Sequence, residues 1–178
     1  FDAELFGHWW FEGPSFLSEL FIQARKEKIT FTRLRDVLSK TPALQLCNPC
    51  PSSWGKGGYH DYWLNETNAW IIPEWSKAAK TMIEHCSKKV SNEAINKRML
   101  EQAARELLLS QSSDWSFILR AGTTIELARN RILLHLSRFW LLIRLIDREE
   151  EPSKEFLNSL KAEDPIFPLI NFKDWSKF

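Results

Sequence analysis

The longest hydrophobic pattern in the chain lies in its second half and has the spacing of an α-helix. Apolar side chains recur every three or four residues, at Ile125, Ala128, Ile132, Leu136, Phe139, Ile143 and Ile146. This spacing predicts a long helix with one apolar face, which begins after Thr123 or Thr124. Because Trp140 and Leu141 widen that face, we expect this helix to be central.

Shorter patterns of the same period predict further helices on both sides of the long one. Their starts are marked by Pro73, by Ser91 or Asn92, by Ser112 or Ser113 and by Pro152, and Gly122 is expected to close the third of them. Pro165 and Pro168 then predict an extended tail. From Asn65 onward the chain therefore predicts a helical bundle.

The start of the chain has a different pattern. Residues 1–6 alternate between apolar and polar side chains, which predicts a short strand, and Gly7 permits a sharp exit from it. Pro14 suits the first turn of a helix, and Thr32 is placed to cap a second, shorter one. The predicted fold class is therefore mainly α, a helical bundle preceded by a short strand fragment.

Residues 41–58 predict a shaped loop, because they hold three prolines and three glycines that interrupt helix and sheet. Within it, residues 44–47 are expected to form a brief strand. Four aromatic residues in or just after the loop argue against disorder, namely Trp54, Tyr59, Tyr62 and Trp63. A loop of this length in a compact domain is typical of a functional segment.

Composition narrows the classes of function. The 178 residues carry 24 Lys and Arg against 23 Asp and Glu, a formal net charge of +1, so the basic excess of a dedicated nucleic-acid-binding protein is missing. No apolar run approaches the length that spans a bilayer. The chain has 9 Trp, 12 Phe and 2 Tyr. Because Trp is normally rare, nine indoles indicate a role beyond filling the core.

The three cysteines are the residues that would indicate a metal site or redox chemistry. Cys47 and Cys50 have the spacing of a metal-binding pair, but no second pair and no suitably spaced His accompany them. We therefore predict no metal site and no cofactor. Ordinary reduced thiols favour a cytoplasmic location.

Two groups of residues are candidates for a catalytic or substrate-binding role. Asp2 is followed closely by His8 and Trp9, and aromatic walls dehydrate a carboxyl and raise its pKa towards the range of a general acid, although a solvated acidic edge is the simpler interpretation. Trp54 and Trp63 could bind a sugar ring on their flat faces or merely anchor the loop to the helices. Asp114 stands at a helix start, where it would commonly act as a cap or face the helix dipole.

The chain opens on Phe1, inside the dense motif FDAELFGHWWFEGP, so we expect it to be a piece of a longer polypeptide. That motif, PSSWGKGGYHDYWLN, QAARELLLSQSSDWSFIL and PIFPLINFKDW together resemble the C-terminal part of glycoside hydrolase family 57 branching enzymes. The resemblance covers nearly the whole chain. It implies that residues 1–40 end a catalytic β/α barrel and that residues 41–178 form a helical C-terminal domain, with a substrate-contacting aromatic loop over residues 49–65.

The resemblance also implies roles for individual residues. Asp2 matches the family's general acid/base, Trp54 and Trp63 match two aromatic residues at the glucan site, and Asp114 matches an Asp that contacts substrate. Thr123 falls where some members have a Gln that contacts substrate, so the resemblance by itself does not establish that contact for Thr123. His8 and Trp9, beside Asp2, complete the expected set of substrate-binding residues. The family's nucleophilic Glu has no counterpart in these 178 residues.

The function implied is that of a 1,4-alpha-glucan branching enzyme, a transglycosylase that cleaves α-1,4 links and forms α-1,6 links in glycogen-like polysaccharide. The expected partners are an α-glucan and the missing barrel portion of the same chain, without nucleic acid or membrane. Without the nucleophile, the fragment alone should be inactive. The alternatives are an α-amylase or 4-α-glucanotransferase of the same family, a non-catalytic glucan-binding module, and a purely structural helical domain.

Overall fold

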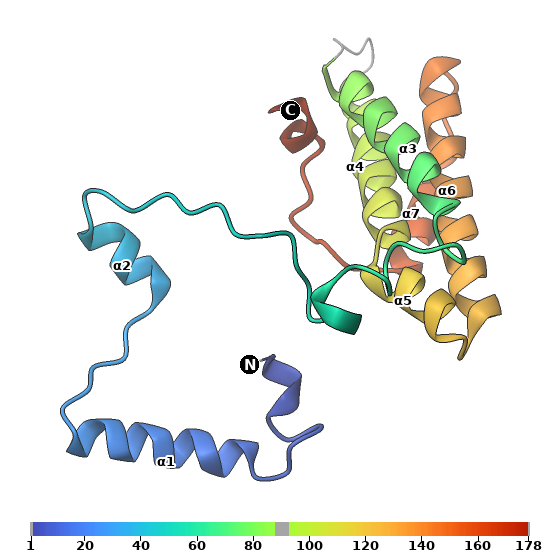
Figure 1. Cartoon of the computed structure of the whole chain (residues 1–178). Helices are drawn as coiled ribbons and strands as arrows, with labels where there is room; N and C mark the ends of the chain where they lie inside the picture. The colour runs from blue at the N-terminus through green and yellow to red at the C-terminus, as the bar shows by residue number, and fades with distance from the viewer. Residues whose placement is uncertain (1, 88–92, 178) are drawn as a thin grey trace. The chain divides into compact units, whose positions relative to one another are not determined.

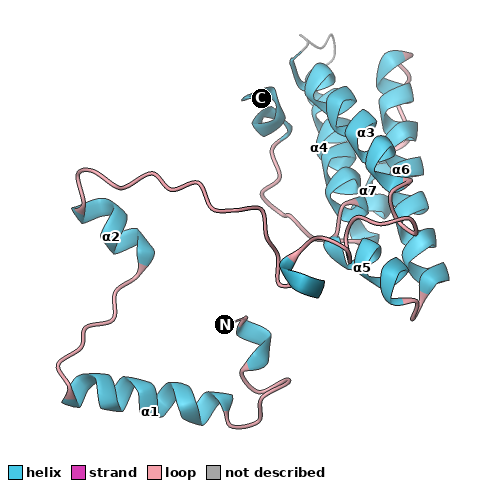
Figure 2. Ribbon diagram, viewed as in Figure 1, coloured by secondary structure: helices cyan, strands magenta, loops and turns pink. Residues whose placement is uncertain are grey.

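The computed structural model describes residues 2–87 and 93–177, and the chain divides into two compact units, Phe1–Cys50 and Pro51–Phe178 (Figure 1). All regular elements in the described residues are helical (Figure 2). The predicted mainly α fold class is therefore confirmed. None of the described helices is both long enough and apolar enough to cross a membrane.

The first unit holds two helices joined by irregular segments. Helix α1 spans Gly13–Lys26 and has Pro14 in its first turn, as predicted. Helix α2 spans Leu34–Lys40, and its N-cap is Arg33 rather than the predicted Thr32. Residues 44–47 have no regular structure, so the brief strand expected there is wrong.

The predicted strand at the start of the chain is replaced by a 3-10 turn, η1, over Ala3–Leu5. Its backbone bonds locally, because the amide of Leu5 donates to the carbonyl of Asp2 at 3.1 Å. Gly7 then turns the chain with φ at 100°, and its amide donates to the carbonyl of Trp10 at 3.0 Å. An alternating pattern offers two faces but no pairing partner, and a strand needs a neighbouring strand for its backbone bonds.

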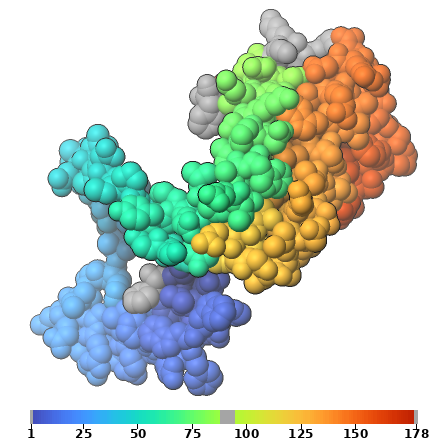
Figure 3. All heavy atoms as spheres, turned by 45° about the vertical axis from the view of Figure 1, so that its right-hand side comes forward, coloured from blue at the N-terminus to red at the C-terminus, as the bar shows by residue number. Residues whose placement is uncertain are grey.

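The second unit is a bundle around α6, which spans Ile125–Asp147. Its other elements are the 3-10 turn η2 (Lys56–Gly58), α3 (Ile71–Ser87), α4 (Glu93–Ser110), α5 (Ser113–Ala121), α7 (Lys154–Glu163) and the 3-10 segment η3 (Phe172–Lys177). The most extensive packing is between α4 and α6, and α6 also contacts α3 and α5. Figure 3 shows α3 in green along α6 in orange. The central place predicted for the long helix is confirmed.

The apolar stripe predicted on α6 forms the core. Ala128, Ile132, Leu136, Phe139 and Ile143 are all buried, and the two ends of the stripe are more open. From α3 and α4, the buried side chains packed against them include Met82, Met99, Ala103 and Leu107. The predicted extended tail is interrupted by η3, whose 3-10 segment packs on α3.

The ends of the helices follow local chemistry. Gly122 closes α5 in the left-handed conformation, at φ 77°, and its amide donates to the carbonyl of Ile118 at 2.9 Å. Ser153 caps α7 by accepting from the amide of Phe156 at 3.1 Å. The cap predicted for α4, Ser91 or Asn92, lies outside the described residues.

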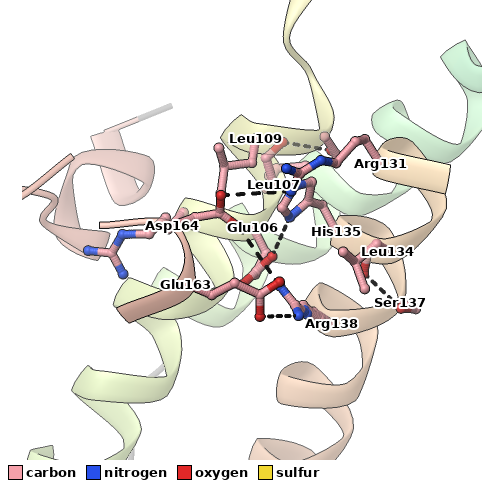
Figure 4. Close-up of polar contacts among 12 residues, drawn as sticks. Glu106, Leu107, Leu109, Arg131, Leu134, His135, Ser137, Arg138, Glu163 and Asp164 are labelled. Atoms are coloured by element: carbon pink, nitrogen blue, oxygen red, sulfur yellow. Dashed lines mark hydrogen bonds and ion pairs between the residues drawn. The ribbon is translucent and has the colours of Figure 1, made fainter. Parts of the chain in front are cut away.

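A polar network crosses the bundle interior (Figure 4). Nδ1 of His135 on α6 lies 2.7 Å from Oε2 of Glu106 on α4, and each side chain is 1% exposed. The other carboxylate oxygen of Glu106 accepts from the amide of Gln102 at 2.8 Å. Buried polar groups of this kind are tolerated because they satisfy one another.

Candidate functional site

The nominated residues fall into two sets, one in each unit. The first unit holds Asp2, His8 and Trp9, and the second holds Trp54, Trp63, Asp114 and Thr123.

In the first set, Asp2 immediately precedes η1 and is exposed. The ring of His8 meets the ring of Trp9 edge to face, with centroids 4.7 Å apart, and Trp9 is 70% exposed. Trp10 packs against Phe16, with ring centroids 5.0 Å apart. The aromatic dehydration predicted for Asp2 therefore requires cover from outside this unit.

In the second set, the loop indoles belong to one aromatic cluster, which we define as Trp54, Tyr62, Trp63 and Phe117. The centroid of Trp54 lies 5.1 Å from that of Trp63, nearly perpendicular to it, and 5.7 Å from that of Phe117. Tyr62 stacks on Phe117 at 4.7 Å with an interplanar angle of 17°. Trp54 is 72% exposed, whereas the other three rings are half-buried. The cluster thus presents one open indole on a supporting layer of rings.

Glycines allow the loop to close tightly beneath these rings. A Cβ added to Gly55 would lie 2.9 Å from both the ring of Trp63 and the carbonyl of Tyr59, so no other residue fits there without displacing them. The hydroxyl of Ser53 accepts from the amide of Gly55 at 2.9 Å and donates to the carbonyl of Tyr59 at 2.5 Å. The turn that presents Trp54 is therefore shaped by short local bonds.

Helix α5 supplies the surface on which the loop rests (Figure 3). Asp114, Phe117 and Arg120 are spaced by three residues and so share one face of this helix. Arg120 donates to Oδ2 of Asp61 in the loop, from Nε at 3.0 Å and from Nη2 at 2.9 Å. Its guanidinium also lies 5.9 Å from the ring centroid of Tyr62. The loop is therefore fixed to α5 by rings and by charge.

Asp114 lies in the first turn of α5, one turn before Phe117. Its carboxylate accepts from the hydroxyl of Ser112 at 3.1 Å and remains exposed. Thr123 is also exposed but lies beyond the other end of α5, roughly 13 Å along the helix axis from Asp114. The structure thus gathers Trp54 and Trp63 around Phe117, with Asp114 one helical turn before it, and places Thr123 beyond the other end of α5.

Sequence reasoning did not nominate Phe117, Arg120 or Asn68. The spacing of Phe117 and Arg120 from Asp114 could have placed them on the same helix face. Nothing in the pattern singled out Asn68, although it is 1% exposed and bonds to both the loop and α5. Within residues 2–87 and 93–177, no cluster of three or more His, Cys, Asp or Glu side chains is arranged to hold a metal ion.

Comparison with known proteins places this chain in a family. A family of domains described as "1,4-alpha-glucan branching enzyme, C-terminal" matches residues 74–175. The chain is 36% identical to a 1,4-alpha-glucan branching enzyme of Thermococcus kodakarensis, in an alignment 178 positions long that covers 96% of this chain and 26% of that protein. The chain spans about a quarter of the length of the curated relatives it matches.

Solved structures of a branching enzyme and of an α-amylase also match. A branching enzyme of the GH57 type from Pyrococcus horikoshii matches with a TM-score of 0.79 and 33% identity, over 99% of this chain and 34% of that one. The α-amylase AmyC from Thermotoga maritima matches with a TM-score of 0.74 and 35% identity, over 99% of this chain and 32% of that one. Because the matching domain accounts for more than half of the chain, the chain belongs to the family of 1,4-alpha-glucan branching enzyme C-terminal domains.

Proposed function

We propose that this chain is the C-terminal portion of a 1,4-alpha-glucan branching enzyme and that its aromatic cluster binds the α-glucan. The observation that carries the proposal is the indole of Trp54, which is 72% exposed although three other rings support it. An exposed aromatic face is open to a ligand, and the C–H face of a glucose ring packs well on an indole. The family match supports glucan as that ligand.

In the proposed reaction, a Glu from the barrel attacks the anomeric carbon of an α-1,4 link and forms a covalent glycosyl-enzyme. Asp2 donates a proton to the departing oxygen. Asp2 then removes the proton from the 6-hydroxyl of an acceptor glucan, whose oxygen displaces the Glu and forms the α-1,6 link. Water competes with that hydroxyl, so we assign to Trp54 and Trp63 the tasks of holding the acceptor and excluding water.

Residues 1–40 are proposed to be the end of the barrel, and the first unit to dock on the rest of it. Large apolar side chains of this unit stand in solvent, such as Phe11 at 90%, Leu34 at 84% and Leu46 at 97% exposure. Docking would cover such side chains and dehydrate the exposed carboxylate of Asp2. The free thiols of Cys47, Cys50 and Cys86 support a reducing, cytoplasmic location.

Replacement of Trp54 by Ala in the complete enzyme tests the role of the cluster. We expect maltoheptaose to bind roughly five- to tenfold more weakly, because a stacking face is lost, and the ratio of hydrolysis to branching to rise. Calorimetry and linkage analysis of the products measure the two effects. Trp70→Ala is the matched control, since Trp70 is a partly exposed Trp of the same unit outside the cluster. An unchanged product ratio in Trp54→Ala would reject the proposal.

The second candidate function is that of an α-amylase, which the likeness to AmyC favours. Linkage analysis separates the two, because a branching enzyme creates α-1,6 links while an amylase only creates new reducing ends. The 178-residue chain by itself is expected to bind maltoheptaose without turning it over, since the nucleophile has no counterpart in it. Turnover by that chain alone would contradict the assignment of the nucleophile to the barrel.

A further inference from the structure

The side chain of Asn68 is a buried junction between the aromatic loop and the bundle. It is 1% exposed and uses both kinds of hydrogen-bonding group. Its carbonyl oxygen accepts from the amide of Asn65 at 2.9 Å, and its NH₂ group donates to the carbonyl of Tyr62 at 3.0 Å and to that of Ser116 at 3.1 Å. Only a carboxamide supplies one acceptor and two donors at this position, so an apolar residue would lose all three bonds and an acidic residue would lose both donors.

The two carbonyls that Asn68 joins belong to segments far apart in the sequence. Tyr62 is a ring of the aromatic cluster, and Ser116 precedes another of its rings, Phe117, on α5. The amide therefore fixes the backbone of the loop against the helix at the point where Tyr62 and Phe117 stack, 4.7 Å apart. A shift of the loop along α5 would break this bond and the stack together.

The stacked pair in turn carries the two indoles. Trp63 follows Tyr62 directly in the chain, and Trp54 lies 6.4 Å from Tyr62 and 5.7 Å from Phe117. A second anchor, the ion pair of Arg120 with Asp61, acts on the residue before Tyr62. It is more open to solvent than Asn68, with side chains 37% and 41% exposed, so it should contribute less.

We propose that Asn68 is a positioning residue, which holds Trp54 and Trp63 in the edge-to-face arrangement that receives the glucan. The inference rests on the proposed function for its ligand, but its geometric part stands on the contacts alone. Without the side-chain amide of Asn68, the loop would become ordered only when a glucan binds. The free-energy cost of that ordering would weaken the affinity. Asn68 acts through the indoles and touches no reacting atom.

The experiment compares Asn68→Ala with the unchanged protein in the full 178-residue chain. Two indoles 5.1 Å apart and nearly perpendicular should give an exciton couplet in circular dichroism, and Trp54→Phe identifies that couplet by abolishing it. In Asn68→Ala we expect the couplet to be mostly lost and maltoheptaose to bind roughly tenfold more weakly, while the helical signal is retained. An Asn68→Ala chain that keeps both the couplet and the affinity overturns the proposal.

The matched control is Gln102→Ala, which removes another buried side-chain amide, from α4. Gln102 is 3% exposed and bonds to Glu106 and Arg105, away from the loop. We expect this variant to melt at a lower temperature yet keep the couplet and the affinity. If it loses the couplet as fully as Asn68→Ala does, the effect is one of global stability and the proposal is overturned.

Two further outcomes keep the test decisive. If Asn68→Ala loses its helical signal, Asn68→Ser replaces it, because it also removes the NH₂ group that bonds to Tyr62 and Ser116. A weaker couplet and roughly threefold weaker binding are then expected, and no change in either overturns the proposal. If the unchanged chain shows no affinity for maltoheptaose, the proposed function fails. The couplet then still decides whether Asn68 positions the indoles.

Discussion

The two units of the chain differ in where their apolar side chains lie. In the second unit Ile71, Met82 and Phe139 are 0% exposed and belong to one continuous core. In the first unit, only Gly13 and Ala24 are buried among the described residues. Its large apolar side chains are mostly in solvent, although α1 and α2 are as regular as the helices of the bundle.

This difference separates a unit that is stabilised by its own packing from one that needs a partner. Helical stability in proteins comes mainly from packing of an apolar face, and helices as short as α1 and α2 are marginal alone. The aromatic cluster is attached to the well-packed unit, through α5. The proposed acid, Asp2, belongs to the other unit and so depends on whatever covers it. A complete site therefore requires the barrel that we propose.

The largest expected effect comes from truncating one Phe in each unit. Phe139→Ala should cost about 3–5 kcal/mol in the free energy of unfolding, because it leaves a cavity in the core of the second unit. Phe11→Ala removes a side chain that is 90% exposed and should change that free energy by less than about 0.5 kcal/mol. Urea denaturation of the 178-residue chain measures both. Equal losses would show that the first unit has a core of its own.

The periodicity of the apolar residues predicted the helices of the second unit well, because the same residues that give each helix its apolar face also pack in the core. The stripe on α6 is buried as expected from Ala128 to Ile143, and Gly122 ends α5 as predicted. The last helix begins at Lys154, two residues after Pro152, with Ser153 as its N-cap. The aromatic loop was also predicted as an ordered segment, since aromatic rings between glycines bury only when the loop is shaped. In the structure Trp54 packs on Phe117, with ring centroids 5.7 Å apart.

The strand predicted over residues 1–6 and the missed role of Asn68 both concern contacts made over long distances. Residues 1–6 have the alternation of a strand, but strand formation depends on a partner that the pattern does not contain. Asn68 was missed for a related reason, because its bond to Ser116 spans 48 residues and no spacing announces it. The roles of Asp2, Asp114 and Thr123 stay predictions, since they concern a ligand rather than the fold.

The cysteines of the two units should differ in chemical reactivity. Cys47 and Cys50 in the first unit are exposed, whereas Cys86 on α3 is buried, and burial raises its pKa to about 11. We expect iodoacetamide to label Cys47 and Cys50 readily at neutral pH, and Cys86 only in denaturant, because the thiolate is the nucleophile. Mass spectrometry of labelled peptides checks this. Rapid labelling of Cys86 in the native chain would contradict its place in the core.

The same thiol predicts a loss of stability in alkali. The pKa of Cys86 is raised on folding from its ordinary value of 9.0, so the folded thiol keeps its proton when the unfolded one has lost it. Ionisation therefore favours the unfolded chain from pH 9.0 upward, until the folded thiol ionises near pH 11. Denaturation midpoints across this window should fall less steeply in Cys86→Ala.

The smallest expected effect comes from one ion pair in each unit. Arg138 on α6 donates to Glu163 of α7 at 2.6 Å, and this bond lowers the pKa of Glu163 (Figure 4). Because the pKa is lowered on folding, the pair stabilises the bundle above the ordinary carboxyl pKa of 4.5 and loses that effect as the pH falls through the folded value. Glu163 is 47% exposed, so Glu163→Gln should cost less than about 1 kcal/mol at neutral pH and nothing in acid.

The counterpart in the first unit is the pair of Arg33 and Asp36, which lies on the exposed start of α2 and joins no second helix. Asp36→Asn should therefore leave the urea midpoint of the bundle unchanged at any pH, whereas Glu163→Gln shifts it only above the carboxyl range. A pair that ties two helices acts on the cooperative unit, while a pair within one exposed helix acts on that helix alone. An equal shift of the midpoint in both variants would mean that the two units unfold as one, and the contrast between them would fail.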